Sequence, residues 1–510
     1  MNVNTTMFPL SPSYSGVQQL QQQFNTLQTQ LSTGLKSSTL SGLGSNLSSD
    51  LNVRSQLSQI GSYDNNISTV NLRLNTVNSV LSSLSSIKSA AVTASTPGVY
   101  GTNNINLTTA PTGAQQQLDQ VLSSLNTDLN GHYLFGGNVV DQPPVASMDT
   151  IMNGSGSLAG FQTVAAQRLQ ADEGTNNMGR LTLSTTADTV TLAQDNTNFG
   201  YTPTAVATSD PSAITVTQPT GTPPSLSVQF ASQPTAGDTV GITLGLPDGT
   251  SDAITMTAVT GTPTNPGEFQ IGADPATTAA NFQAALTSSI QGDTPSKLAA
   301  ASNYAAANNF FNGSGESVQR VAIDPVTNSY ATATGYETPA QTASDTVQWY
   351  TGENSATNAR ASVSTKVDST VNVNYGVEAN EEGFTSLVRS LAVQSIQNYP
   401  TTDATTTAAS QAKFNAIAAG QTSSLSEADD STPGSLTSIG VDLGLAQTTL
   451  QNLSDQHASY STQLQDIVAN AENADPNEVA SQILQVQTSL EASYSVMSMV
   501  SQLQLANYLK

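Results

Sequence analysis

The sequence predicts a mainly α-helical protein, in which a coiled-coil-like helical hairpin built from both termini carries an inserted α+β, β-rich domain at its tip. Three observations predict this fold class. Apolar residues recur at helical spacing near both ends, the middle of the chain alternates as strands do, and charged residues make up only 10% of the 510 residues. Ser, Thr, Asn, Gln and Ala replace charged residues, so we expect a polar but largely uncharged surface.

The first element is a helix near the N-terminus. Its apolar residues follow a 3-4-3-4-4 spacing, which places them on one stripe of a helix. A stripe of this width needs a partner helix to cover it. The stripe consists of Val17, Leu20, Phe24, Leu27, Leu31 and Leu35.

Two further helices are expected before residue 150. After a Gly/Ser-rich break at 37–49, the helical spacing resumes and predicts a long second helix. The segment AQQQLDQVLSSLNTDLNG then predicts a shorter, antiparallel return helix that ends at Gly131. The long helix carries its apolar stripe at Val53, Leu57, Ile60, Ile67, Val70, Leu74, Val77, Leu81, Leu84 and Ile87.

The middle of the chain is expected to be β-rich. Proline, aspartate and glycine at 247–249 mark a tight turn between two strands. Asp274 and Pro275 have the character of a helix cap and a first helical residue. The alternating runs that predict strands are AITVTQ, SLSVQFA, DTVGITLGL and SDAITMTAV.

The chain is then expected to return to helices. A short strand leads into a helix whose apolar residues Phe384, Leu387, Leu391 and Ile396 we expect to be buried. The run TTDATTTAASQ at 401–411 indicates a flexible surface segment. A helical stripe then follows at Ala446, Leu450, Leu453, Tyr460, Leu464 and Ile467.

The last helix has a clear predicted start. Asp475 is placed as the N-cap, Pro476 as the first helical residue and Glu478 as the third residue after the cap. We expect its apolar face to pair with the N-terminal stripe of similar length. That face consists of Val479, Ile483, Val486, Leu490, Tyr494, Met497, Val500 and Leu505.

These elements suggest three domains. The terminal stripes, from Val17 to Leu31 and from Val479 to Leu505, are the expected assembly interface. The domains are a terminal helical assembly domain at 1–45 and 476–510, a helical rod domain at 46–150 and 361–475, and one or two inserted β-rich outer domains at 151–360.

Composition limits the function classes. A net charge of -24 would repel a phosphate backbone, so we expect no nucleic-acid partner. No run approaches 18 apolar residues, so we expect no membrane insertion. The first residues lack the charged and apolar regions of a cleaved secretory signal. The chain has no cysteine, which excludes disulfides, thiolate catalysis and cysteine-ligated zinc.

The residues that carry catalysis or metal binding are scarce. His132 and His457 are the two histidines, they lie far apart, and structural roles are expected for both. No G-x-S-x-G elbow is present. The acidic runs at 378–382 and 427–430 lack the spacing of a calcium loop and are interpreted as solvated surface. We therefore expect that the protein is not an enzyme and that it binds no cofactor and no metal. Trp349 is a large aromatic residue, and we expect it to anchor the inserted domain as a core residue.

Several motifs are similar to those of one family. QLSTGLK resembles the turn between the first two helices of bacterial flagellins, and NGHYLFGGN resembles the G-x-Y-[LI]-F-x-G signature of the hook-filament junction proteins (hook-associated protein 3). The ending LEASYSVMSMVSQLQLANYL is also similar to that branch. Over about the first 150 and the last 140 residues, the chain resembles the flagellin family.

Two branches of the family remain open. The stretch GLGSNLSSD stands where filament flagellins commonly have Asp-Asp-Ala-Ala-Gly, which favours the junction branch. The insertion of about 200 residues favours a filament flagellin, because it is large for a junction protein and ordinary for a filament flagellin. Some major flagellins also carry junction-like termini. The motifs lean slightly toward the junction role.

The resemblance implies a structural subunit of the extracellular bacterial flagellum. It implies type III export of unfolded chains with an export chaperone, followed by self-assembly of the terminal helices into a helical or ring homo-oligomer with other flagellar axial proteins. Uncharged Ser, Asn and Gln beside the stripes suit such packing, because no charge is desolvated. The alternatives are an intramolecular helix bundle that forms no polymer, and an extracellular adhesin or glycan-binding protein of flagellin-like fold.

Overall fold

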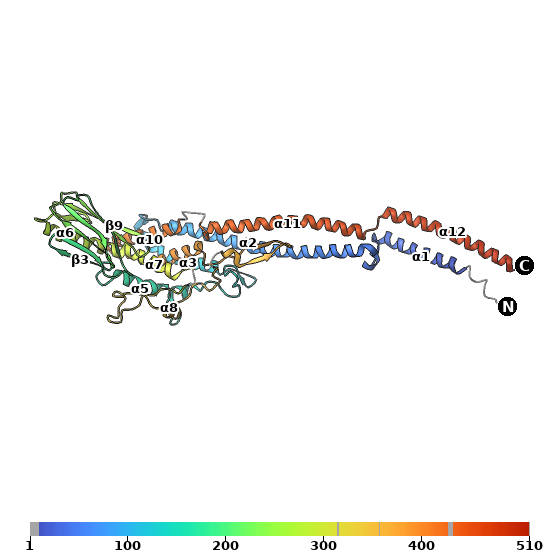
Figure 1. The fold of residues 1–510 in the computed structure, drawn as a ribbon, viewed down its shortest axis with the longest axis horizontal. Helices are drawn as coiled ribbons and strands as arrows, with labels where there is room; N and C mark the ends of the chain where they lie inside the picture. Colours follow the sequence, from blue (N-terminus) through green and yellow to red (C-terminus); the bar gives the residue numbers. More distant parts are fainter. Residues whose placement is uncertain (1–9, 314–315, 356–357, 427–431, 509–510) are drawn as a thin grey trace. The chain divides into compact units, whose positions relative to one another are not determined.

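The structure, a computed structural model, describes residues 10–313, 316–355, 358–426 and 432–508, with the backbone alone at 10–13 and 503–508. The chain forms two compact units. The first contains residues 1–70, 366–373 and 448–510, and the second contains residues 71–365 and 374–447. Long helices at both ends and a β-rich insertion between them confirm the predicted fold class (Figure 1). The division into three domains stays a prediction.

The first unit is helical apart from one short hairpin. Helix α1 lies beside α12, and the N-terminal part of α2 lies beside the C-terminal part of α11 (Figure 1). The elements are α1 (Leu10–Thr33), η1 (Leu40–Asn46), the first part of α2 (Leu47–Ala94), residues 366–373 of the hairpin formed by β11 (Ser364–Lys366) and β12 (Asn372–Asn374), the last part of α11 (Leu436–Glu472), and α12 (Pro476–Tyr508).

The α2 stripe is confirmed, while part of the α11 stripe is wrong. Val53 and Ile60 are buried against Leu464, as a heptad-like seam requires. Tyr460 and Ile467, however, are 45% and 46% exposed. The buried positions of the α11 heptad include His457 and Leu464. Tyr460 and Ile467 each lie one residue away from a heptad position, so they face solvent.

His457 therefore has a structural position. Its side chain is buried, and its Nδ1 lies 2.7 Å from Oδ1 of Asp64. Its ring packs near Tyr63 with the centroids 6.1 Å apart. Its burial and this hydrogen bond agree with the structural role predicted for His457.

The second unit combines helices with two four-stranded sheets and a short two-stranded one. Its aromatic centre includes Trp349, which is 3% exposed and packs against Phe311 at 5.7 Å, so the prediction of a core tryptophan is confirmed. The helices are α3 (Ile105–Leu125), α4 (Met148–Asn153), α5 (Phe161–Glu173), α6 (Pro275–Asp293), α7 (Ala299–Phe310), α8 (Pro339–Asp345), α9 (Glu382–Ser395) and α10 (Ala404–Leu425), with the short turns η2 (Thr102–Asn104), η3 (Thr294–Leu298) and η4 (Ala359–Ser362).

Two four-stranded sheets form the β-rich part, with the strand orders β10-β9-β8-β5 and β3-β4-β7-β6. Helix α6 packs on them through Phe282, whose ring lies 5.4 Å from Phe230 and 5.2 Å from Phe269. The strands are β3 (Leu181–Thr186), β4 (Thr189–Gln194), β5 (Thr202–Thr208), β6 (Ile214–Thr220), β7 (Ser225–Phe230), β8 (Thr239–Gly245), β9 (Ser251–Val259) and β10 (Glu268–Gln270).

The local signals in this region are confirmed. The four alternating runs form β6, β7, β8 and β9, and the 247–249 turn joins β8 to β9. Asp274 caps α6 by accepting a hydrogen bond of 2.7 Å from the backbone N–H of Thr277. Over residues 181–293 the sequence contains nine acidic residues and no Lys, Arg or His.

One peptide unit on the free edge of β5 is occupied by a side chain. Gln218 of β6 donates from Nε2 to the carbonyl oxygen of Val206 at 2.5 Å, and its Oε1 accepts from the Val206 N–H at 3.3 Å. The side-chain amide thus pairs with one peptide unit as a neighbouring strand would.

Two sequence predictions of local structure are wrong. The return helix α3 ends at Leu125, not at Gly131, because Asn130 and Gly131 adopt φ values of 55° and 82° and form the turn of a hairpin between β1 (Asp128–Leu129) and β2 (His132–Tyr133). The segment 401–411 is largely helical, since α10 begins at Ala404. Asp403 caps this helix through the Thr406 N–H at 2.9 Å.

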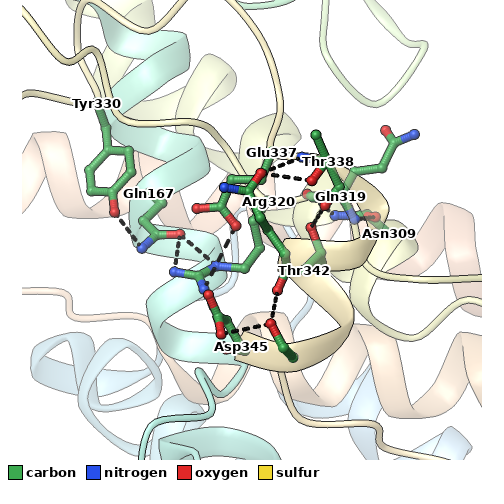
Figure 2. A network of polar contacts seen from close by, with 11 residues as sticks. Gln167, Asn309, Gln319, Arg320, Tyr330, Glu337, Thr338, Thr342 and Asp345 are labelled. Carbon is green, nitrogen blue, oxygen red and sulfur yellow. Dashed lines mark hydrogen bonds and ion pairs between the residues drawn. The ribbon is translucent and has the colours of Figure 1, made fainter.

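The long connection between α7 and α8 is fixed by side-chain hydrogen bonds (Figure 2). Arg320 donates from Nε and Nη2 to Oε1 of Gln167 on α5, each at 3.3 Å. Gln167 in turn donates to the hydroxyl of Tyr330 at 2.9 Å. Arg320 also reaches the carbonyl oxygen of Asp345 at 3.3 Å. Polar contacts thus replace regular backbone structure in this connection.

The NGHYLFGGN motif forms part of a polar junction in the second unit. The Gly137 N–H donates to the carbonyl oxygen of Val377 at 3.1 Å, and the Ala379 N–H donates to that of Phe135 at 2.8 Å. A Cβ at Gly137 would lie 2.9 Å from the Cβ of Glu353. The motif requires glycine here because the two backbone segments approach so closely.

Candidate assembly interface

The candidate interface is built on the antiparallel pair of α1 and α12. Near the start of α12, Val479 and Val486 pack with Leu27 of α1 and are 5–6% exposed. Further along, Gln21 Nε2 donates to the hydroxyl of Tyr494 at 2.6 Å. The two terminal stripes therefore meet along a single seam.

The segment that follows α1 and the segment that precedes α12 are joined by backbone hydrogen bonds. The Ala474 N–H donates to the Gly34 carbonyl at 2.9 Å, and the Lys36 N–H donates to the Glu472 carbonyl at 2.7 Å. Gly34 has a φ of 70°, which ends α1 as the STG turn predicts. This small bridge fixes the register at which the helices start to pair.

An arginine lies beside this bridge. Arg54 contacts Glu472, and its Nε lies 3.0 Å from Oδ2 of Asp50. The hydrogen bonds to these two carboxylates raise the pKa of Arg54. The exposed position of the guanidinium limits its effect on stability.

The start of α12 is as predicted, but with different capping bonds. Asp475 accepts at Oδ1 from the Asn477 N–H at 2.8 Å. The side chain of Glu478 accepts instead from Gln482 Nε2 at 3.1 Å, so it points along the helix. The predicted N-cap at Asp475 is confirmed. Glu478 does not complete a capping box and instead makes a side-chain hydrogen bond within the first turns of α12.

The predicted interface residues differ in burial. Val17, Leu27, Val479 and Val486 are buried. Leu20, Phe24, Ile483 and Leu490 are partly buried against the seam, and Met497 and Val500 are half-buried. Leu31 and Tyr494 are 46% and 47% exposed. The side chain of Leu505 lies outside the described residues.

An apolar groove extends the seam toward the chain ends. It has a volume of about 500 Å³. Val496 in its wall is 56% exposed, and the neighbouring Met499 is 55% exposed. The groove is lined by Gly16, Val17, Leu20, Ala492, Ser493, Val496, Met497 and Val500.

Four of these groove residues lie outside the predicted interface, namely Gly16, Ala492, Ser493 and Val496. Gly16 and Ala492 have little or no side chain and leave room between the helices. Val496 lies beside the predicted stripe rather than on it. Small residues at helical spacing on both helices would have been the signal for the groove.

Charge is almost absent from the pair. Helix α1 contains no charged residue, and α12 contains Glu478 and Glu491. Burying such a surface against another protein would therefore desolvate few ions. The arrangement can bind apolar side chains, and it holds no constellation for acid–base or nucleophilic chemistry.

Across the described part of the chain there is no group of three or more His, Cys, Asp or Glu side chains placed to hold a metal ion. None of the helices there combines the length and hydropathy that crossing a bilayer requires.

A family model of known proteins matches part of the chain. Residues 3–139 match the family model of the bacterial flagellin N-terminal helical region. The match supports the bacterial flagellin family. It covers α1, α2, α3 and the NGHYLFGGN motif, and it suggests a structural subunit of the flagellum. No curated protein and no solved structure matched the chain.

The match bears on several predictions at the level of the family. Flagellins are structural, non-enzymatic components of the external flagellar filament, which agrees with the absence of a predicted catalytic site. The match does not favour the adhesin alternative. It also does not separate the junction branch from the filament branch.

Proposed function

We propose that this protein is a structural subunit of the bacterial flagellum that self-assembles through its N- and C-terminal helices. The observation that carries the proposal is the α1/α12 pair, because it exposes apolar side chains and almost no charge. Leu31, Tyr494 and Val496 are each about half exposed in the single chain. Burial against other copies would remove this apolar area from water and stabilise the assembly.

The proposal includes the route and the partners that the family implies. The chain is exported through the flagellar type III apparatus with an export chaperone and joins other axial proteins outside the cell. Burying a stripe of six to eight apolar side chains contributes on the order of 10 to 20 kcal/mol gross. That contribution offsets the ordering of terminal helices that have little support in a single chain.

Charge substitution on the exposed face of α12 tests self-assembly in the full chain. Met499→Asp should leave the monomer folded and prevent polymerisation, because an unpaired carboxylate would be buried in the assembly. Sedimentation and electron microscopy measure the polymer. Val326→Asp is the matched control, since Val326 lies 90% exposed in the connection between α7 and α8. Polymerisation of Met499→Asp at the rate of the unmodified chain would contradict the proposal.

Truncation provides a second test. A chain lacking 1–45 and 476–510 should remain monomeric, and filaments from it would exclude assembly through the ends. The junction and filament roles are separated by electron microscopy of cells that lack the protein. Loss of the filament with continued secretion of another flagellin supports the junction role, and immunogold labelling along the whole filament supports the filament role.

A further inference from the structure

Two of the three glutamates in the acidic run at 378–382 are not the solvated surface that the sequence suggests, whereas the side chain of Glu382 is 54% exposed. Glu378 is 1% exposed, and the side chain of Glu381 is 12% exposed. The Glu378 N–H donates to Oε1 of Glu381 at 3.0 Å, and Oε2 of Glu378 accepts from the Ser355 N–H at 3.0 Å. The backbone junction with the glycine motif encloses these carboxylates.

A polar pocket of about 560 Å³ lies over this run. Its rim is fixed where Gly383 approaches the chain before α11, since the Gly383 N–H donates to the Gly434 carbonyl at 2.8 Å. A Cβ at Gly383 would lie 2.5 Å from the backbone nitrogen of Leu436. The charged residues that line the pocket are Arg360, Glu378, Glu381, Glu382 and Asp442.

Ion pairs inside the second unit compensate half of these carboxylates. Arg360 pairs with Glu381, and Arg389 Nη1 lies 3.0 Å from Oε1 of Glu382. Burial raises the pKa of Glu381, and Arg360 opposes that effect. Among the described residues, Glu378 and Asp442 have no cationic partner. The pocket therefore carries two uncompensated negative charges.

Buried polar atoms near the pocket also lack partners. Oε1 of Glu378 and Oδ1 of Asn380 are shielded from solvent and accept no hydrogen bond from the described residues. An uncompensated buried carboxylate is costly, and a cation in the adjacent pocket would lower that cost by charge alone.

We propose that this pocket binds a small organic polycation, such as a diamine or a longer polyamine. One ammonium group can donate to the exposed carboxylate of Asp442. A second ammonium group in the pocket would offset the charge of the buried Glu378 through space. A metal ion fits less well, because the described residues offer no metal-binding group of three side chains. The volume exceeds what a single hydrated ion requires.

Calorimetric titration of the full chain, kept monomeric, with putrescine and with spermidine tests this assignment. Saturable binding of one ligand per chain is expected, with spermidine the tighter ligand. Asp442→Asn should weaken binding by about tenfold, as expected when one charge-assisted hydrogen bond is lost. Asp442 is exposed, so this variant should fold. Glu378→Gln should weaken binding by a similar factor.

Asp119→Asn is the matched control, because Asp119 is an exposed carboxylate of α3 outside the pocket. Its affinity for spermidine should equal that of the unmodified chain. The assignment is overturned by an absence of saturable binding, by unchanged affinity in Asp442→Asn, by an equal loss in Asp119→Asn, or by calcium chloride binding at the pocket as tightly as putrescine.

Discussion

The β-rich sheets and the α1/α12 pair bury their apolar side chains to very different extents. Phe230, Phe269 and Phe282 are 0% exposed between the two sheets and α6. In the helix pair the predicted residues range from 5% exposed at Leu27 to 47% exposed at Tyr494. Two sheets and a helix enclose a core, whereas two helices share one line of contact and leave their outer faces uncovered.

This difference shows which region buries its apolar side chains within the chain and which region needs a further protein surface to do so. The apolar residues of the sheets are buried within the second unit, so the sheets need no partner protein. The helix pair has apolar residues on a surface that only a further protein surface can cover. Substitutions in the two regions should therefore have different consequences.

The largest expected effect is in the β-rich core. Phe282→Ala should lower the free energy of unfolding of this region by about 3 to 5 kcal/mol, because it removes a ring packed against two others and leaves a cavity. Urea unfolding followed by near-ultraviolet circular dichroism measures the change. Ser288→Ala on the exposed face of α6 is the control and should have little effect. A loss below about 1 kcal/mol for Phe282→Ala would mean that the core is less tightly packed than its burial indicates.

A smaller effect is expected in the helix pair. Val486→Ala should increase amide hydrogen exchange in α1 and α12 by about tenfold, as expected when about 1.5 kcal/mol of side-chain burial is lost. Exchange in the β-rich strands should stay the same. Val486→Ile preserves the apolar contact and should leave exchange near that of the unmodified chain. Equal changes in both regions would show that the pair and the sheets unfold together.

The smallest expected effect is a pH dependence at a helix cap. The Thr406 N–H lowers the pKa of Asp403 below its ordinary value of 3.8. Because the folded value lies below the unfolded one, the contribution of the cap is complete above about pH 3.8 and is lost as the pH falls through the folded value. Asp403→Asn keeps an acceptor that does not titrate.

Unfolding midpoints at a series of acidic pH values test this effect. The unmodified chain should lose slightly more stability on acidification than Asp403→Asn. Parallel losses in the two proteins would mean that the cap at α10 adds no pH dependence of its own.

The helical stripes and the alternating strands were readable from the sequence because each depends on local periodicity. The pairing of α1 with α12 followed from the matching lengths of two uncovered stripes. The end of α3 was not readable from apolar spacing, since Leu129 continues the helical pattern. The left-handed turn at Asn130 and Gly131 overrides that pattern.

Other features depend on contacts between distant segments. The run at 401–411 is rich in threonine, and its helix is specified by the cap at Asp403 and by Phe414 at 0% exposure. The burial of Glu378 results from segments more than 200 residues apart in sequence, since Gly136 bridges to it. No local pattern reports such a long-range backbone pairing.

The hydrogen bonds between the Gln218 side-chain amide and Val206 affect how the β-rich regions of neighbouring chains can interact. If many copies of the chain stand close together, each presents its sheets to its neighbours at high local concentration. A bare strand edge under those conditions would template intermolecular β-structure and lead toward amyloid-like fusion. Occupying the peptide unit of Val206 internally removes one such docking point, so neighbouring β-rich regions can be packed densely and still remain separate.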